Sequence, residues 1–179
     1  GAGQQDLIVN RQTKDLEAYN LYINGRRMWK TRTREGMRDS IEKFEIALSK
    51  DPDFALAYVG IADAYNQLVM YGHSPPQVAF PKAKEELKKA LALNDSLSEA
   101  HASFGFIQYV YDCNWDAALK SLIKALNLNP NYPDARRWLS HVHITMGNYS
   151  LALEEIDNGI NLEPNSGNML TAKSLYLIH

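Results

Sequence analysis

The chain has 179 residues and a formal net charge of −2 at pH 7, with 45% hydrophobic and 22% charged residues. This balance argues against direct binding of nucleic acid, because gripping a polyanion normally needs a basic surface. A single cysteine, Cys113, excludes an internal disulfide or a cysteine metal cage and fits a reducing compartment. This favours a cytoplasmic location, but the sequence does not determine the compartment. No apolar run in the sequence approaches the roughly 18 residues of a membrane-spanning helix.

The first part of the chain predicts a tail followed by a helix. Residues 1–14 have mixed polarity and no sustained period, which predicts a flexible N-terminal tail. A helix is expected from Leu16 to Trp29. Further along, Pro75 and Pro76 predict a long loop from Gly72 to Phe80, because proline lacks the amide hydrogen that continues a helix.

One spacing of small residues recurs four times along the chain. A small residue is followed seven positions later by a second, five later by Pro or Asp, and ten later by a third small residue. A fixed period of about 20 to 50 residues indicates a repeat architecture. The four copies are Ser40, Ala47, Pro52 and Ala62; Ala83, Ala90, Asp95 and Gly105; Ala118, Ala125, Pro130 and Ser140; and Ala152, Gly159, Pro164 and Ser174.

This spacing predicts pairs of packed helices. Seven residues make two helical turns, so the first two small residues of each copy share one helix face, where bulk would hold a neighbouring helix away. The proline ends that helix, and the third small residue belongs to the next. Gly159 stands where the other copies have Ala. We therefore expect Gly159→Ala to stabilise the protein by roughly 0.5–1 kcal/mol.

These features resemble the tetratricopeptide repeat, a helix-turn-helix unit of about 34 residues with small residues at the helix crossings. The resemblance implies an all-α fold, a right-handed superhelical solenoid of antiparallel helix pairs in a single domain over residues 15–179. The implied repeats cover residues 15–52, 53–95, 96–130 and 131–164, and a terminal helix covers residues 167–179. The best-matching copy runs from Pro133 to Ser166, with the family's residue types at Leu139, Ser140, Gly147, Tyr149, Ala152, Ile156 and Pro164.

Candidates for catalytic or metal chemistry are few. His141 and His143 lie two positions apart, so on a helix their side chains point about 200° away from each other. Zinc on a helix prefers ligands three or four residues apart, so we expect one histidine in a packing slot and the other on the open face. Cys113 is expected in a turn, buried or half-buried, rather than as a nucleophile. We predict no enzyme activity, no cofactor and no metal site.

The resemblance implies a binding surface on the first helix of each pair, which lines a concave groove in this family. Aromatic rings, amides and a few charges there suit an extended or helical peptide held by stacking, hydrogen bonds and shape. We also expect some of the rings to pack between helices instead. Carried over by repeat spacing, the partner-binding residues are Tyr22, Arg26, Trp29, Asp63, Asn66, Gln67, Phe106, Tyr109, Arg137 and His141.

A basic cluster on the first helix and its turn is a competing contact surface. Arginine beside an aromatic ring can hold the carboxylates or phosphates of an acidic partner or neighbouring domain. The cluster comprises Arg26, Arg27, Lys30, Arg32, Arg34 and Arg38, with Trp29 among them. A carboxylate clamp of the kind found in chaperone-binding members is not expected, because its Lys and Asn positions hold Val59, Asp63, Glu99, Ser103 and Asp134.

A narrower resemblance covers residues 18–65, through Gly25-Arg26, Trp29 and Asp51-Pro52. This stretch is similar to repeat regions at the C-terminal end of bacterial signalling proteins that often carry a nucleotide cyclase or a winged-helix domain upstream. Two hypotheses stay open. The chain is either a scaffold that binds a protein or peptide partner, or an accessory sensory or oligomerisation segment with neighbouring domains in a larger protein. The sequence does not identify the partner.

Overall fold

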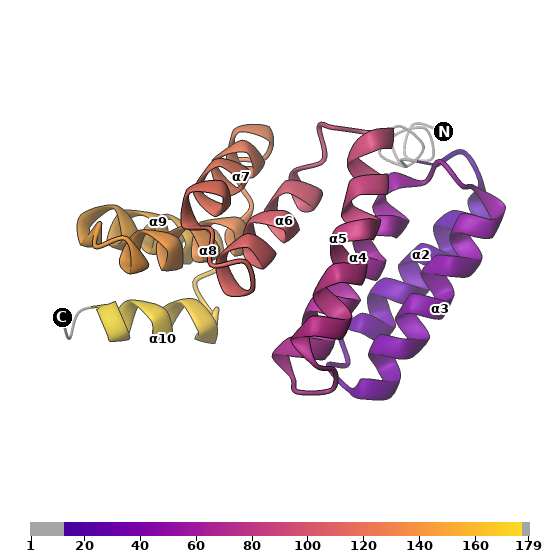
Figure 1. Cartoon of the computed structure of the whole chain (residues 1–179), viewed down its shortest axis with the longest axis horizontal. Helices are drawn as coiled ribbons and strands as arrows, with labels where there is room; N and C mark the ends of the chain where they lie inside the picture. The colour runs from indigo at the N-terminus through magenta and orange to yellow at the C-terminus, as the bar shows by residue number, and fades with distance from the viewer. Residues whose placement is uncertain (1–12, 177–179) are drawn as a thin grey trace. The chain divides into compact units, whose positions relative to one another are not determined.

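The computed structural model describes residues 13–176, and that part of the chain consists of helices and turns without a β-strand (Figure 1). The predicted all-α class is confirmed, and the first helix has the bounds expected from the sequence. Most of the predicted tail lies outside the described residues. Thr13 is buried and donates a hydrogen bond to the Asp51 carboxylate. The helices are α2 (Leu16–Trp29), α3 (Arg34–Lys50), α4 (Ala55–Met70), α5 (Pro76–Leu93), α6 (Ser98–Val110), α7 (Trp115–Leu128), α8 (Pro133–Thr145), α9 (Tyr149–Leu162) and α10 (Gly167–Tyr176).

The chain divides into two compact units, Gly1–Asp95 and Ser96–His179. In the first unit α2 packs against α3, and α4 packs against both α3 and α5. In the second unit α6 packs against α7, α8 packs against both α7 and α9, and α10 packs against α9. Each unit is therefore a short stack of helix hairpins. The single-domain organisation and the repeat boundaries expected from the sequence stay predictions.

The first unit is built around the fully buried ring of Phe44 on α3. Two glycines from neighbouring helices lie against this ring. A Cβ added at Gly25 of α2 would lie 2.6 Å from Phe44 Cε1, and one added at Gly60 of α4 would lie 2.7 Å from Phe44 Cζ. The helices approach the ring this closely because glycine has no side chain. The other buried members of the cluster are Ala18, Ala47, Phe54, Ala57 and Ile61.

The connection between α4 and α5 is shorter than predicted. We expected a loop from Gly72 to Phe80, but α5 begins at Pro76. Pro76 occupies the first helical position, where the missing amide hydrogen would have no partner in the helix and the fixed φ of proline suits it. Pro81 lies further inside the same helix. The prediction was wrong because it treated proline as a helix breaker regardless of its position in the helix.

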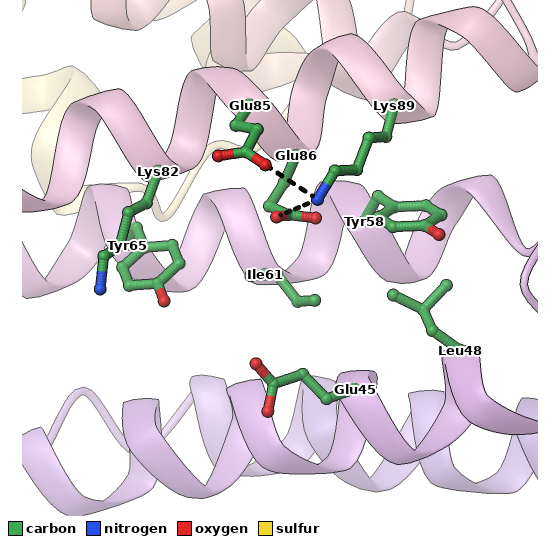
Figure 2. A pocket seen from close by; sticks show the side chains of 9 residues that line it. All are labelled: Glu45, Leu48, Tyr58, Ile61, Tyr65, Lys82, Glu85, Glu86 and Lys89. Carbon is green, nitrogen blue, oxygen red and sulfur yellow. Dashed lines mark hydrogen bonds and ion pairs between the residues drawn. The ribbon is translucent and has the colours of Figure 1, made fainter.

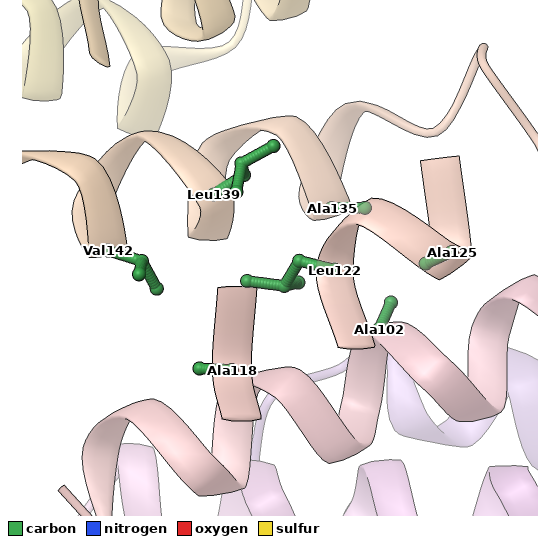
Figure 3. Close-up of a cluster of buried hydrophobic side chains, with 7 residues drawn as sticks. All are labelled: Ala102, Ala118, Leu122, Ala125, Ala135, Leu139 and Val142. Atoms are coloured by element: carbon green, nitrogen blue, oxygen red, sulfur yellow. The ribbon is translucent and has the colours of Figure 1, made fainter. Parts of the chain in front are cut away.

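The second unit contains two hydrophobic clusters. In one, Leu122 of α7 packs among side chains of α6 and α8 (Figure 3). A Cβ added at Gly105 of α6 would lie 2.6 Å from Leu122 Cγ, so this crossing also depends on a glycine. Its other buried members are Ala102, Ala118, Ala125, Ala135, Leu139 and Val142. The second cluster joins α9 to α10 through Ala152, Ile156, Met169, Ala172 and Tyr176.

Most small residues of the repeated spacing are buried, as the predicted helix crossings require. Ser174 differs, because it is exposed on α10. Cys113 differs from its expected burial as well. It lies in the turn between α6 and α7, as expected, but it is exposed rather than buried or half-buried. All of residues 112–116, in this turn and at the start of α7, are exposed. The fully buried members of the spacing are Ser40, Ala47, Ala62, Ala83, Ala90, Ala118, Ala125, Ser140 and Ala152.

Candidate functional site

The predicted partner-binding residues fall into two groups, one in each unit, on the helices that open each hairpin. Within the first unit α2 contacts α4, and within the second unit α6 contacts α8. Each group therefore lies on neighbouring first helices of its own unit. Tyr22, Arg26 and Trp29 come from α2, Asp63, Asn66 and Gln67 from α4, Phe106 and Tyr109 from α6, and Arg137 and His141 from α8.

An ion pair joins the two first helices of the first unit. Arg26 Nη1 lies 3.1 Å from Asp63 Oδ2, and the two side chains are 32% and 17% exposed. The guanidinium of Arg26 also lies 4.5 Å from the centre of the Trp29 ring. A charge-assisted hydrogen bond between partly buried groups fixes both side chains in one geometry. Arg26 and Asp63 therefore shape the face between α2 and α4 rather than offering an unpaired charge.

Tyr22 belongs in part to the core of the first unit. The centre of its ring lies 5.6 Å from that of Phe44 and 5.1 Å from that of Phe54, with tilted planes. Tilted rings at these distances attract each other beyond the effect of the buried area alone. Tyr22 is thus one of the rings that pack between helices, an outcome that the sequence led us to expect for some of them.

Three polar atoms of the first group are buried without a hydrogen-bond partner in the described part of the chain. They are Trp29 Nε1, Asn66 Oδ1 and Gln67 Oε1. The indole nitrogen is a donor and the two amide oxygens are acceptors. A buried polar atom without a partner costs about 1–3 kcal/mol. All three atoms are covered by the protein itself, so a partner could reach them only if the covering groups moved.

The second group forms an aromatic surface on α6 and α8. The ring of Tyr109 lies nearly parallel to that of His141, with an interplanar angle of 8° and centres 6.4 Å apart. Tyr109 also shares a hydrogen bond of 3.2 Å with Thr145 across the two helices. Phe106 is buried, and its ring centre lies 4.4 Å from that of Trp138. Phe106 therefore supports this surface from beneath.

Trp138 is the main residue that the sequence reasoning missed. Its ring lies between those of Phe106 and His141, with its centre 5.5 Å from the latter. The guanidinium of Arg137 lies 3.9 Å from the centre of the Trp138 ring and forms an ion pair of 2.8 Å with Asp134. The repeat spacing selected the positions before and after Trp138. A tryptophan three residues before a predicted groove histidine was the available signal.

His141 is neutral at pH 7. Its burial, followed by the nearby positive charge of Arg137, lowers the pKa of His141 from 6.5 to about 4. Tyr176 of α10 holds the imidazole through a hydrogen bond of 2.7 Å between its hydroxyl and Nδ1. A neutral imidazole between Tyr109 and Trp138 adds a flat, weakly polar surface rather than a charge. This surface suits apolar and hydrogen-bonding groups of a ligand.

His143 takes the packing position that we expected for one histidine of the pair. It is 8% exposed, and its Nδ1 has no hydrogen-bond partner in the described part of the chain. Burial lowers the pKa of His143, and the carboxylate of Glu155 opposes that effect. The two histidines therefore lie in different surroundings. Within residues 13–176, no group of three His, Cys, Asp or Glu side chains is placed to hold a metal ion.

The chain resembles known helical-repeat proteins in part of its sequence and in its fold. Residues 114–176 match the family model described as tetratricopeptide repeat. The second unit thus carries a tetratricopeptide repeat sequence, and the whole chain has the fold of tetratricopeptide repeat proteins. Its tetratricopeptide repeat fold is typical of scaffolds for protein-protein interaction, and such folds are generally non-catalytic. No curated protein matches the chain in sequence.

Three solved structures show the likeness of fold. The tetratricopeptide repeat protein TTC0263 of Thermus thermophilus has a TM-score of 0.76 and 20% identity, over 92% of this chain and 83% of that one. The type IV pilus biogenesis factor PilW has a TM-score of 0.73 and 17% identity, over 92% and 70% of the chains. The first tetratricopeptide repeat domain of Spaghetti (RPAP3), bound to the HSP90 peptide SRMEEVD, has a TM-score of 0.60 and 20% identity, over 76% and 98%.

The length and composition of the described helices bear on whether they could span a membrane. Among the residues that the structure describes, none forms a helix with both the length and the apolar character that a membrane span requires. The resemblance of residues 18–65 to repeat regions of bacterial signalling proteins stays a prediction.

Proposed function

We propose that this protein is a non-catalytic interaction module of the tetratricopeptide repeat kind, and that a segment of a partner protein binds over α6 and α8. The observation that carries the proposal is the aromatic surface of Tyr109, Trp138 and His141, with Arg137 stacked on Trp138. Rings already held in place offer a large contact area at little cost in conformational entropy. Interaction hot spots are enriched in these side chains, Trp, Tyr and Arg above all.

The chemistry of the surface narrows the class of partner. His141 is neutral at pH 7 and the charge of Arg137 is balanced by Asp134, so the surface does not select a strongly charged ligand. We expect a partner segment with an apolar or aromatic side chain that packs on Trp138, and with polar groups that reach Tyr109. In the first unit, the partly exposed side chains of Trp29 and Gln67 would contact a partner segment, while Asn66 is buried.

A second candidate function is that of an accessory segment in a larger signalling protein. Here the contact surface would be the basic turn between α2 and α3, where Arg32 and Arg34 are exposed. Arginines placed in a turn suit the carboxylates of a neighbouring domain. The two candidates differ in which residues carry the binding energy, and that difference can be measured.

The test uses peptides of twelve random residues, displayed and selected for binding to the whole chain, with affinities then measured by fluorescence anisotropy. Tyr109→Ala and Trp138→Ala should each be assayed for retained helicity by circular dichroism. At least one should weaken binding more than about tenfold, or about 1.4 kcal/mol. Matched controls are Tyr149→Ala on α9 and Trp115→Ala on α7, whose side chains are 53% and 42% exposed. These should bind normally.

The opposite pattern would reject the proposal. If Tyr109→Ala and Trp138→Ala bind the selected peptides as the wild type does, the aromatic surface is not the site. If, in addition, Arg32→Ala or Arg34→Ala abolishes binding, the basic turn is the contact surface. Phe106 is unsuitable as a probe, because it is 4% exposed and its removal would disturb the packing beneath the surface.

A further inference from the structure

A pocket lies in the first unit between α3, α4 and α5, on the side of α4 roughly opposite to Asp63 and Gln67. It has a volume of about 390 Å³, which falls in the range of ordinary ligand sites. Tyr58 and Tyr65 of α4 line its floor, with Ile61 between them (Figure 2). The other lining residues are Glu45 and Leu48 from α3, and Lys82, Glu85, Glu86 and Lys89 from α5.

The charges around the pocket are unevenly paired. Lys89 Nζ lies 2.9 Å from Glu86 Oε1 and 3.3 Å from Glu85 Oε1, so one ammonium group already has two carboxylates. Glu45 projects from α3 toward the open space, facing α4 and α5 (Figure 2). Among the described residues no ion pair or hydrogen bond is formed by the carboxylate of Glu45. The pocket therefore carries an uncompensated negative charge.

The tyrosine faces already accept cations. Lys89 Nζ lies 5.9 Å from the centre of the Tyr58 ring, and Lys82 Nζ lies 5.6 Å from that of Tyr65. A cation within about 6 Å of an aromatic centre is attracted by the ring's quadrupole. Burial raises the pKa of Tyr65, and the carboxylates of Glu45 and Glu86 raise it further, as expected where the local potential is negative. An anion would be repelled from this pocket.

We propose that the pocket binds the guanidinium group of an arginine side chain presented by a partner polypeptide, with Glu45 as its counter-ion and Tyr65 as its stacking surface. Guanidinium is favoured over ammonium because its flat face stacks on a ring while its edge donates two parallel hydrogen bonds to a carboxylate. This proposal is independent of the aromatic surface on α6 and α8, because the pocket lies wholly in the first unit.

The probe is the capped tripeptide glycyl-arginyl-glycine amide, titrated into the whole chain while the ring-proton signals of Tyr58 and Tyr65 are followed by NMR. The same peptide with citrulline is its neutral control. We expect saturable shifts of the tyrosine signals with the arginine peptide only. Glu45→Gln should weaken this binding at least about fivefold, or about 1 kcal/mol. Glu42→Gln, an exposed neighbour on α3 that does not line the pocket, should leave it unchanged.

A substitution that is expected to strengthen binding provides a second test. Lys82 competes with a ligand for the face of Tyr65, so Lys82→Gln should tighten binding of the arginine peptide. The proposal is overturned if neither tyrosine signal shifts, if the citrulline peptide shifts both equally, or if Glu45→Gln and Glu42→Gln have the same effect. Tyr109→Ala should not change this titration, so the two binding proposals can fail separately.

Discussion

Tyr176 Oη lies 2.7 Å from His141 Nδ1, which connects α10 to the aromatic surface of α8. The same hydroxyl lies 3.1 Å from Ser140 Oγ. The two rings meet edge-on, with centres 5.9 Å apart and an interplanar angle of 89°. One phenol therefore fixes the position of α10 and the orientation of the imidazole together.

Removing this hydroxyl should destabilise the protein. Tyr176→Phe keeps the ring in its cluster but leaves His141 Nδ1 without this partner, while Ser140 Oγ still donates to the Arg137 carbonyl. We therefore expect a loss of about 1 kcal/mol in the free energy of unfolding. Urea denaturation followed by circular dichroism measures it. Tyr149→Phe is the control, because that side chain is 53% exposed on α9. Equal effects of the two substitutions would show that the hydroxyl of Tyr176 stabilises the fold no more than the exposed hydroxyl of Tyr149 does.

Acidification should destabilise the protein between pH 6.5 and pH 4. The pKa of His141 is about 4 in the folded protein and 6.5 in its ordinary state, because of burial and of Arg137. Between these values the unfolded chain binds more protons, which favours unfolding. The stability that a neutral His141 provides is thus complete above pH 6.5 and is lost as the pH falls toward 4. Each pKa unit corresponds to about 1.4 kcal/mol.

His143 shifts in the same direction, so the contribution of His141 has to be isolated. We would measure urea unfolding of the wild type and of His141→Gln at pH 7 and at pH 5. The wild type should lose more stability on acidification than the variant. An NMR titration of the His141 ring proton gives its pKa directly, and a midpoint near 6.5 would contradict the prediction.

Local periodicity predicted much of this fold because the relevant physics is local. Small residues seven positions apart can meet a neighbouring helix only on one face, and Ala83, Ala90, Ala118 and Ala125 are fully buried as that reasoning requires. The start of α5 was missed because proline is tolerated in the first turn of a helix, and the sequence alone did not show whether Pro76 preceded or opened it.

The candidate site was harder to predict because its contacts join residues far apart in the sequence. The predicted positions are brought onto neighbouring first helices within each unit, but repeat spacing did not reveal that Trp138 lies between Phe106 and His141. It also did not show that Tyr176 would cover the imidazole. Binding by the predicted residues stays a prediction. The pocket at Glu45 depends on side chains from three helices, which no single periodic pattern could indicate.

The close approach of α4 to Phe44 gives a prediction about packing. Gly60→Ala should cost roughly 1–3 kcal/mol, because the new methyl group would overlap a fully buried ring. Phe44→Leu is itself destabilising, but in that background the added cost of Gly60→Ala should be smaller, which a double-mutant cycle measures. Gly167→Ala is the control, because nothing lies within 4 Å of its added Cβ. Additive effects of Gly60→Ala and Phe44→Leu would contradict the contact.

The packing at Gly159 predicts an effect opposite to the one expected from the sequence. A Cβ added there would lie 2.9 Å from Met169 Sδ, and Met169 is 1% exposed in the cluster between α9 and α10. Overpacking costs roughly 1–3 kcal/mol, which exceeds the gain of roughly 0.5–1 kcal/mol from replacing a helical glycine by alanine. Gly159→Ala should therefore lower the thermal midpoint.

Removing the obstacle should restore the expected gain. In a Met169→Ala background the added methyl group at position 159 meets no sulfur atom, so Gly159→Ala should then raise stability by roughly 0.5–1 kcal/mol, the helical preference of alanine over glycine. Urea denaturation of the wild type, the two single variants and the double variant measures the effect of Gly159→Ala on stability with and without Met169. Met169 is flexible, and a small rotation of its side chain would relieve the contact. If Gly159→Ala stabilises the protein with Met169 present, that rotation costs less than the helical gain, and the crossing of α9 and α10 tolerates alanine like the other crossings.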